Sequence, residues 1–391
     1  MRKIKRKLVL PPKSFFLFGP RGVGKSFLMK ETLNPKYSFT LLDQRLYLEL
    51  SKDPGKIREY LFQAKKGDWV LIDEIQKIPG LLDEVHYLIE EKKFNFALSG
   101  SSARKLKRSG ANLLAGRALT TNLYPFSLSE LGYEYNLKSI LEFGALPLAI
   151  ADQKNAINFL HSYFGTYIKE EIKEEGLVRK IEPFLRFLEV AGILNGQQVN
   201  SSNISREAKI ARATVDTYFS ILEDTLIGNF LPAYRPNLKV QEQDHPKFYW
   251  FDSGVARAAA SLLGEKLDDD WLRRSLETFI LHEIKSYISY FQKYKGLFYY
   301  RAKSGLEVDF VIELKKRSSS HPAEVILIEV KYSKKWKGEY EQAMRSILEN
   351  KKIKVKHAIG LYMGDIPLDR AEVQVLPIKD FIKRLNNGEF F

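Results

Sequence analysis

Residues 15–30 read Phe-Phe-Leu-Phe-Gly-Pro-Arg-Gly-Val-Gly-Lys-Ser-Phe-Leu-Met-Lys. An apolar run leads into Gly-x-x-x-x-Gly-Lys-Ser, and a stretch with amphipathic spacing follows the motif. This order predicts a strand, a phosphate-binding loop and a helix. The glycines let backbone N–H groups turn toward a phosphate, and the N-terminal end of the helix adds a positive potential.

The motif predicts a site for a nucleoside triphosphate, with ATP and Mg²⁺ as the expected cofactors. Lys25 is expected to reach the β- and γ-phosphates, and Ser26 is expected to hold the metal ion. The candidate nucleotide-binding residues are Gly19, Pro20, Arg21, Gly22, Val23, Gly24, Lys25, Ser26 and Phe27.

A second apolar run, Asp68-Trp-Val-Leu-Ile-Asp-Glu, ends in two acids. It reads as a buried parallel strand whose carboxyl end reaches the nucleotide. Asp73 suits a water-mediated contact with Mg²⁺, and Glu74 suits polarising the attacking water. The adjacent pair favours hydrolysis over nucleotide binding alone.

A third apolar run, Phe94-Asn-Phe-Ala-Leu-Ser-Gly, leads to Ser101. In an ATPase of this plan, a polar residue at that place senses the γ-phosphate. Ser101 also fits the N-cap of a following helix, and the sequence leaves both roles open.

The composition limits the classes of protein and of partner. A net charge of +14 favours nucleic acid or another anionic surface as a partner. The absence of cysteine excludes disulfides and thiolate metal sites. No apolar stretch approaches the length of a membrane span, and the basic N-terminus lacks the apolar core of a secretory signal. We therefore expect a cytoplasmic protein with no membrane partner.

Residues 183–230 have the pattern of a helix-turn-helix followed by a strand, typical of a winged helix. The exposed face of the second helix would offer one cation and one acid, Arg212 and Asp216, which is little for reading bases. Contact with DNA and packing within a helical lid both stay open.

The C-terminal third carries a second group of charged residues on apolar elements. Glu283 falls on the inward stripe of a helix expected over residues 276–291, and Asp309 lies in a strand. Glu329 and Lys331 are two residues apart on the next strand, so they share a face. Because isolated buried charges are costly, this pattern indicates a joint site.

The chain resembles the AAA+ ATPases, in particular a prokaryotic group that shares five motifs with it. These are Gly-Pro-Arg-x-x-Gly-Lys-Ser, Leu-Ile-Asp-Glu-Ile-Gln, Ser-Gly-Ser-Ser, Gly-Arg and Pro-Phe-Ser-Leu-x-Glu-Leu, which begin here at Gly19, Leu71, Ser99, Gly116 and Pro125. The resemblance implies a homo-oligomer, with a hexameric ring as one form, in which Arg117 acts on the nucleotide of a neighbouring subunit. A surface cation or an internal salt bridge is the alternative role of Arg117.

The same group ends in a domain that resembles the PD-(D/E)xK nuclease superfamily. That resemblance implies that Asp309 and Glu329 hold Mg²⁺, with Glu283 adding a carboxylate. Lys331 would position or activate the attacking water. A salt-bridged pair of Glu329 and Lys331 in a domain that does not cleave is the alternative.

The expected fold class is α/β, in three domains. A P-loop AAA+ domain with a parallel sheet covers residues 1–126, a helical lid with a winged helix-turn-helix covers 127–240, and a restriction-endonuclease-like α/β domain covers 241–391. The expected function is ATP hydrolysis coupled to binding, remodelling or translocating DNA, with Mg²⁺-dependent DNA cleavage as an added activity. The alternative is a nucleotide-dependent switch whose C-terminal domain binds DNA or protein without cleaving.

Overall fold

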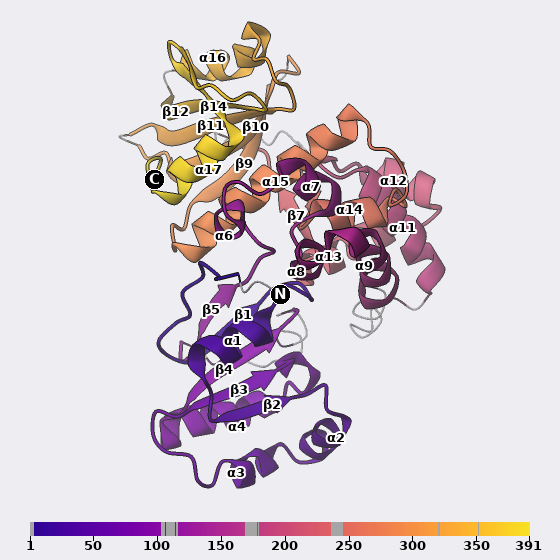
Figure 1. Ribbon diagram of the computed structural model, residues 1–391, viewed down its shortest axis with the longest axis vertical. Coiled ribbons are helices and arrows are strands. Elements are labelled where there is room, and N and C mark those ends of the chain that lie inside the picture. The colour runs from indigo at the N-terminus through magenta and orange to yellow at the C-terminus, as the bar shows by residue number, and fades with distance from the viewer. Residues whose placement is uncertain are drawn as a thin grey trace.

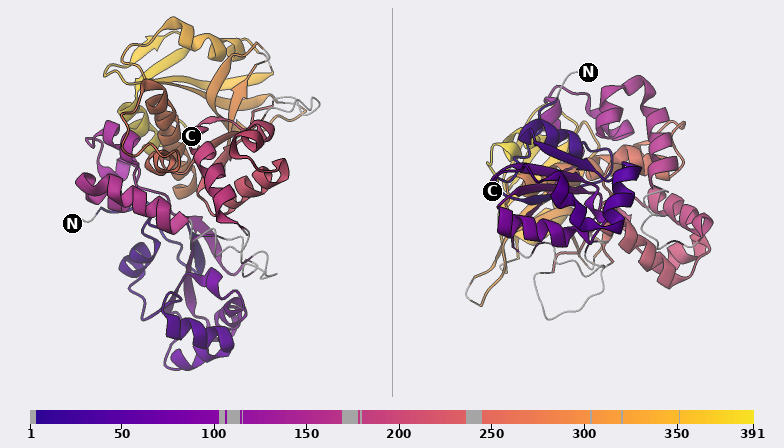
Figure 2. Two further views of the ribbon diagram at one scale, coloured as in Figure 1. Left: turned by 90° about the vertical axis from the view of Figure 1, so that its right-hand side faces the viewer. Right: turned by 90° about the horizontal axis from the view of Figure 1, so that it is seen from below.

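The computed structural model describes residues 4–102, 106, 114, 116–168, 178, 180–235, 245–302, 304–319, 321–350 and 352–391. Two sheets lie at opposite ends of its long axis, and a group of helices lies beside and between them (Figures 1 and 2). Within the described ranges, no helix has both the length and the apolar composition needed to cross a membrane.

The N-terminal sheet is parallel throughout, with the strand order β2-β3-β4-β1-β5. Its strands are β1 (Phe15–Phe18), β2 (Tyr37–Thr40), β3 (Trp69–Asp73), β4 (Asn95–Gly100) and β5 (Leu119–Asn122). Strand β1 lies between β4 and β5, so the carboxyl ends of β1, β3 and β4 meet at one edge of the sheet. The predicted phosphate loop and both polar segments leave the sheet at that edge.

Alternate side chains of β1 enter different hydrophobic clusters, because the sheet is buried on both faces. Phe15 and Leu17 belong to one cluster, and Phe16 and Phe18 belong to another. This explains why the strand reads as a continuous apolar run. The helices of this part are α1 (Lys25–Leu33), α2 (Gln44–Lys52), α3 (Ile57–Tyr60) and α4 (Leu81–Tyr87), with short turns η1 (Pro54–Lys56), η2 (Ile75–Lys77) and η3 (Leu88–Lys92).

The middle part is mainly helical and includes a small antiparallel sheet. Its helices and turns are α6 (Leu128–Leu131), α7 (Leu137–Phe143), α8 (Pro147–Ala151), η4 (Gln153–Asn155), α9 (Ala156–Ser162), η5 (Tyr163–Ile168), α11 (Ile181–Ile193), α12 (Ser201–Ala208), α13 (Arg212–Asp224) and α14 (Ser253–Ala259). The sheet has the order β6-β8-β7, with β6 (Gln197–Gln198), β7 (Gly228–Leu231) and β8 (Lys247–Trp250). The predicted pair of short helices is present as α12 and α13, and β7 follows it.

Strand β8 lies after the expected domain boundary at residue 240, yet it pairs with β7 on one side and β6 on the other. All four of its residues are buried. The strand therefore belongs to the middle sheet, although its position in the chain assigned it to the C-terminal domain.

The C-terminal sheet is mixed and has the order β13-β14-β12-β11-β10-β9. Strands β9, β10 and β11 are antiparallel, whereas β11, β12 and β14 run parallel. Helices α15 and α17 contribute to the hydrophobic cluster on one face, and α16 contributes to the cluster on the other. The elements are α15 (Asp269–Tyr290), β9 (Gly296–Arg301), β10 (Glu307–Lys315), β11 (Ala323–Lys331), η6 (Gly338–Glu341), α16 (Gln342–Leu348), β12 (Ile353–Tyr362), β13 (Leu368–Arg370), β14 (Val373–Pro377) and α17 (Ile378–Asn386).

Helix α15 begins seven residues before the expected start at Leu276. The side chain of Asp268 accepts a hydrogen bond from the backbone N–H of Trp271 at 2.7 Å, which caps the helix. The first turn contains Asp269 and Asp270, whose negative charges interact favourably with the positive N-terminal end of the helix. The longer helix runs from the C-terminal sheet toward the parallel sheet (Figure 1).

Candidate nucleotide site and acidic cluster

The loop between β1 and α1 has the backbone geometry of a phosphate loop. Gly22 and Gly24 have φ angles of 81° and 95°, which favour glycine, and Gly24 is the N-cap of α1. A Cβ atom on Gly19 would lie 2.3 Å from the carbonyl oxygen of Leu123, so only glycine fits at the start of the loop. The residues present therefore fit a phosphate group at the end of α1.

Lys25 lies over the loop with its side chain folded back. Its Nζ donates to the carbonyl oxygens of Gly19 at 2.7 Å and Pro20 at 3.1 Å. The residue is buried, so its charge is held close to the loop by these acceptors. Val23 is also buried and packs in the core, whereas the side chain of Phe27 is exposed.

Ser26 and Asp73 meet as a Mg²⁺ site of this kind requires. The Ser26 hydroxyl donates to Oδ2 of Asp73 at 2.7 Å, and the Ser99 hydroxyl donates to Oδ1 of the same carboxylate. Hydroxyl and carboxylate oxygens are the ligands that Mg²⁺ prefers, and substrate phosphates complete such sites. The donor set fits Mg²⁺ bound together with a triphosphate.

Glu74 follows Asp73 in a left-handed conformation, with φ of 62°. Its backbone N–H donates to the Ser99 hydroxyl at 3.3 Å, and its carboxylate accepts from Nε2 of Gln76. The same Nε2 lies 3.2 Å from the Ser101 hydroxyl. Gln76 therefore joins the two residues expected to polarise water and to sense the γ-phosphate.

Gln76 is a functional candidate that reasoning from the sequence missed. It is buried, and in the part of the chain that the structure describes its Oε1 has no hydrogen-bond partner. A Cβ atom on Gly100 would lie 2.7 Å from that oxygen, so the backbone at the end of β4 passes close to it. The residue was visible as the last member of the motif Leu-Ile-Asp-Glu-Ile-Gln, but its role became clear only from these contacts.

Arg117 lies between β4 and β5 and forms an ion pair with Glu90 of η3. Its side chain is 37% exposed, so it can be reached from outside the subunit. The pair with Glu90 is the internal salt bridge that the sequence left as one alternative. The role toward a neighbouring subunit remains a proposal.

The middle part of the chain contacts the phosphate loop directly. The hydroxyl of Tyr163 donates to the carbonyl oxygen of Arg21 at 2.8 Å. The Tyr163 ring would lie 3.3 Å from a Cβ atom on Gly22. A change in the shape of the phosphate loop would therefore alter its contact with Tyr163 of η5.

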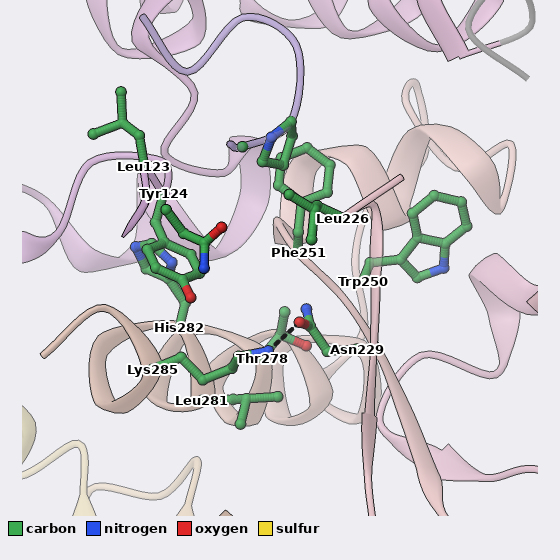
Figure 3. Close-up of a pocket in the computed structure, with 13 residues that line it drawn as sticks. Leu123, Tyr124, Leu226, Asn229, Trp250, Phe251, Thr278, Leu281, His282 and Lys285 are labelled. Atoms are coloured by element: carbon green, nitrogen blue, oxygen red, sulfur yellow. Dashed lines mark hydrogen bonds between the residues drawn. The ribbon is translucent and has the colours of Figure 1, made fainter. Parts of the chain in front are cut away.

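A cavity of about 150 Å³ lies beside the start of the loop (Figure 3). Lys285 projects from α15 into its wall and donates to Oδ1 of Asn229, while burial lowers the pKa of Lys285 to about 8. Burial also lowers the pKa of His282 to about 4, so this imidazole is neutral. The cavity is lined by Gly19, Pro20, Asn122, Leu123, Tyr124, Leu226, Asn229, Trp250, Phe251, Thr278, Leu281, His282 and Lys285.

The C-terminal sheet brings Asp309, Glu329 and Lys331 together. Oδ2 of Asp309 accepts from the backbone N–H of Val330 at 2.8 Å, and Lys331 pairs with Oε1 of Glu329. Burial, and then the charge of Asp309, raise the pKa of Glu329 well above its ordinary value. In the described chain, Oε2 of Glu329 is buried without a hydrogen-bond partner.

Glu277 of α15 joins this group, and Glu283 does not. Oε2 of Glu277 accepts from the Tyr249 hydroxyl at 3.1 Å and lies 3.8 Å from Nζ of Lys247. Burial, and then the charge of Asp309, raise the pKa of Glu277 to about 7. We call Glu277, Glu307, Asp309 and Glu329 the acidic cluster.

Glu283 is buried as expected. The prediction that its carboxylate joins Asp309 and Glu329 was wrong. Its Oε1 accepts from the backbone N–H of Leu128 at 2.6 Å, at the start of α6. Six residues along a helix amount to about 240° of rotation beyond a full turn, so Glu277 and Glu283 face different neighbours. Burial raises the pKa of Glu283 to about 8.

Lys247 of β8 lies inside the acidic cluster. Its Nζ contacts Glu307 and lies 3.8 Å from Oδ1 of Asp309. Burial opposes its charge, but Tyr249 and the carboxylates of Glu277, Asp309 and Glu307 raise the pKa of Lys247 well above its ordinary value. Among the described residues, no group of three or more His, Cys, Asp or Glu side chains is arranged to hold a metal ion.

Three family models match different parts of the chain. Residues 11–132 match an AAA domain. Residues 134–266 match a domain of unknown function, DUF8612, and residues 273–381 match another domain of unknown function, DUF4143. The second and third descriptions assign no activity to the regions that they cover.

Two curated relatives are described as uncharacterized. A protein of Haemophilus influenzae is 23% identical over 225 residues, which are 53% of this chain and 56% of that protein. A protein of Methanocaldococcus jannaschii is 23% identical over 345 residues, which are 80% of this chain and 74% of that protein. The chain thus spans little more than half the length of the first relative.

Among solved structures, the Aeropyrum pernix Orc1 protein in complex with DNA is 15% identical, covering 65% of this chain and 87% of that chain. The TM-score is 0.25, which carries no argument about the fold or the ligands of this chain. The AAA match does agree with the parallel sheet and the phosphate loop described above. The N-terminal part of the chain is therefore similar to an AAA domain and has a parallel α/β sheet with a phosphate loop.

Proposed function

We propose that this chain is an ATP-hydrolysing AAA+ protein that acts on DNA. The observation that carries the proposal is the meeting of Ser26 with Asp73 beneath a buried Lys25, at the edge where β1, β3 and β4 end. The second acid at this edge, Glu74, favours hydrolysis over nucleotide binding alone. Gln76 donates to the Glu74 carboxylate and would orient it.

Each residue of the site has a proposed task. Bound Mg²⁺ would neutralise charge on the β- and γ-phosphates. Ser26 and Asp73 would hold the ion, and Lys25 would turn from its carbonyl acceptors to the phosphates. Glu74 would accept a hydrogen bond from the attacking water, while Ser101 would lie near the γ-phosphate.

Arg117 supports the proposal that the chain works as an oligomer. An arginine supplied across a subunit interface stabilises the charge that develops during phosphoryl transfer. The partly exposed side chain of Arg117 is compatible with that use, once the ion pair with Glu90 opens. This role would require a homo-oligomer, and a hexameric ring is one form of it.

DNA is proposed as the partner because exposed cations gather on the C-terminal part of the chain. Lys334, Lys335 and Lys337 are exposed in the segment after β11, close in sequence to Lys331. Lysines that neutralise phosphates provide most of the affinity in non-specific DNA binding. The surface of α13 offers less, because it carries an acid, Asp216, which accepts from the Ser201 hydroxyl at 2.6 Å.

We keep a three-part organisation for the chain, with the second boundary moved beyond α14. The AAA domain comes first, a helical part with α12, α13 and the small sheet comes second, and the mixed sheet with α15 comes third. The third part is proposed as a nuclease-like fold that binds DNA. Cleavage is not assigned to it, because each acid of its cluster already has a basic partner.

The test is ATP hydrolysis measured without DNA and with single-stranded, duplex and branched DNA. We expect DNA to increase turnover, and we expect Lys25→Ala to remove turnover under every condition. A chain that hydrolyses ATP at one rate with and without every DNA would instead be a nucleotide switch with a protein partner. The lengths of the DNA after each reaction, with Mg²⁺ or Mn²⁺, report cleavage in the same samples.

A further inference from the structure

We propose that Lys247 is the resident cation of the acidic cluster and keeps divalent metal ions out of it. The proposal does not involve the nucleotide site and stands whether or not DNA is the partner of the ATPase. Nζ of Lys247 lies 3.8 Å from Oε2 of Glu277, 3.8 Å from Oδ1 of Asp309 and in contact with Oε1 of Glu307. One ammonium group thus stands between three carboxylates.

The sheet of the middle part fixes Lys247 in this place. Alternate residues of β8, Phe248 and Trp250, belong to the hydrophobic cluster of the middle part. Tyr249 belongs to the cluster beneath the C-terminal sheet, so Lys247, two residues away, shares its direction. The backbone of Lys247 pairs with β6 and β7, which fixes the position from which the side chain reaches the cluster.

The charges of the cluster are already balanced. Arg273 donates to Oε1 of Glu277 at 3.2 Å, and Arg301 lies 3.7 Å from Oε2 of Glu307. Lys331 pairs with Glu329, and Lys247 lies between the remaining carboxylate oxygens. Four carboxylates therefore face four basic side chains, which leaves no excess negative charge for a divalent ion.

The geometry also disfavours a metal ion. Mg²⁺ requires near-octahedral oxygen ligands at about 2.0–2.1 Å, and an ammonium group between the ligands repels it. Oε2 of Glu329 is buried and unpartnered within the described ranges, but a single oxygen makes a poor site. The metal that the nuclease resemblance implies does not fit the side chains as they lie.

The ion network instead joins parts of the chain that are far apart in sequence. Lys247 comes from the middle sheet, Glu277 from α15, and Glu307 and Asp309 from β10. Burying these charges is tolerated because they satisfy each other, and removing one partner leaves a costly unpaired charge. The cluster therefore fastens the middle part to the C-terminal sheet.

The experiment measures Mn²⁺ binding by full-length protein without nucleotide. All chains carry Asp73→Asn and Glu74→Gln, so that these two positions of the nucleotide site contribute no carboxylate. The reference chain is compared with Lys247→Met, Lys247→Arg, Asp309→Asn and the double variant Lys247→Met with Asp309→Asn. Free Mn²⁺ is followed by electron paramagnetic resonance, and unfolding is followed by circular dichroism with and without Mn²⁺.

We expect Lys247→Met to gain one Mn²⁺ site per chain, about tenfold or more tighter than any site in the reference chain, and to melt at a higher temperature when Mn²⁺ is added. Lys247→Arg keeps the cation and should gain nothing, and the double variant should lose the gained site. The proposal is overturned if the reference chain binds one Mn²⁺ that Asp309→Asn removes. A Lys247→Met chain that gains no site, or stays unfolded even with Mn²⁺, also contradicts it.

Discussion

The hydroxyl of Ser26 donates to Oδ2 of Asp73 at 2.7 Å, which joins the first turn of α1 to the last residue of β3. The two residues lie 47 positions apart in the chain. Their contact brings a hydroxyl and a carboxylate to the place where the loop glycines turn. Mg²⁺ and a triphosphate would enter between them, so this hydrogen bond marks the centre of the proposed ATPase site.

Replacing Lys25 with alanine should lower ATP turnover by about a hundredfold or more, because the phosphates lose their cation. ATP affinity should fall in the same variant. Lys30→Ala is the matched control, since Lys30 lies on the same helix with an exposed side chain. Steady-state hydrolysis and equilibrium nucleotide binding check both effects. Normal turnover by Lys25→Ala would remove the phosphate-loop assignment.

Glu74→Gln should retain bound ATP and lose hydrolysis. The amide keeps the shape of the side chain but accepts a proton from water poorly. Single-turnover assays separate the two steps, because ATP binding is measured before product appears. Hydrolysis at the wild-type rate would show that another group polarises the water.

Gln76→Leu tests whether the contact with Glu74 matters for the reaction. The variant keeps the size of the side chain but removes the donor to Glu74 and to Ser101. We expect kcat to fall by about tenfold, with little change in KM, because the carboxylate loses its orientation. A fall in melting temperature with unchanged kcat would mean that Gln76 only supports the fold.

The parallel sheet and the nucleotide site could be predicted because their signals are local. A buried strand, a glycine loop and a helix follow each other within residues 15–33, and each acid ends an apolar run. Gln76 could not be placed, because its contact with Ser101 joins η2 to the segment after β4. Ser101 is 25 residues away from Gln76 in the chain, and only the sheet order brings the two together.

The helical periodicity of the sequence was not sufficient to predict the acidic cluster. The helical pattern indicated that Glu283 is buried, which is correct, but burial did not identify what it faces. Glu277 lies on the same helix and meets Asp309 because of how α15 crosses the C-terminal sheet. Lys247 was missed because a lysine before Phe-Tyr-Trp reads as a strand end, and its partners come from a different sheet.

Arg117→Ala and Glu90→Gln form a pair that tests the proposed role at a subunit interface. If Arg117 acts on a neighbouring nucleotide, Arg117→Ala should cut turnover by about a thousandfold while ATP affinity is kept. Glu90→Gln removes the ion pair between Glu90 and Arg117 and should leave turnover unchanged or higher. Hydrolysis by the assembled protein and ATP binding by the isolated subunit measure the two effects.

Mixed assemblies provide the control for Arg117. Subunits carrying Arg117→Ala, mixed with subunits carrying Lys25→Ala, should recover part of the activity, since a composite site takes one part from each chain. If Arg117 only pairs with Glu90, both single variants should keep full turnover and change stability by less than about 1 kcal/mol. Mixtures that co-assemble without recovering activity would contradict an action between subunits.

Glu283→Gln should make the protein less sensitive to alkaline pH. Burial raises the pKa of Glu283 to about 8 in the folded chain, although the hydrogen bond from Leu128 acts to lower it. An exposed glutamate titrates near pH 4.3. Between these values the folded state binds the proton and the unfolded state does not, so stability falls as pH rises. Below this window both states hold the proton and no penalty exists.

The glutamine keeps an oxygen that can accept from the backbone N–H of Leu128, but it carries no charge at any pH. The free energy of unfolding of Glu283→Gln, minus that of the wild type, should therefore increase by roughly 3–5 kcal/mol from pH 5 to pH 9. Urea denaturation at several pH values measures this difference. Glu134→Gln is the control, because the side chain of Glu134 is 92% exposed and should give a difference that does not change with pH. A difference for Glu283→Gln that is equally flat would mean that the carboxylate is ionised in the folded protein, and that its contact with the start of α6 resembles an ordinary charged helix cap.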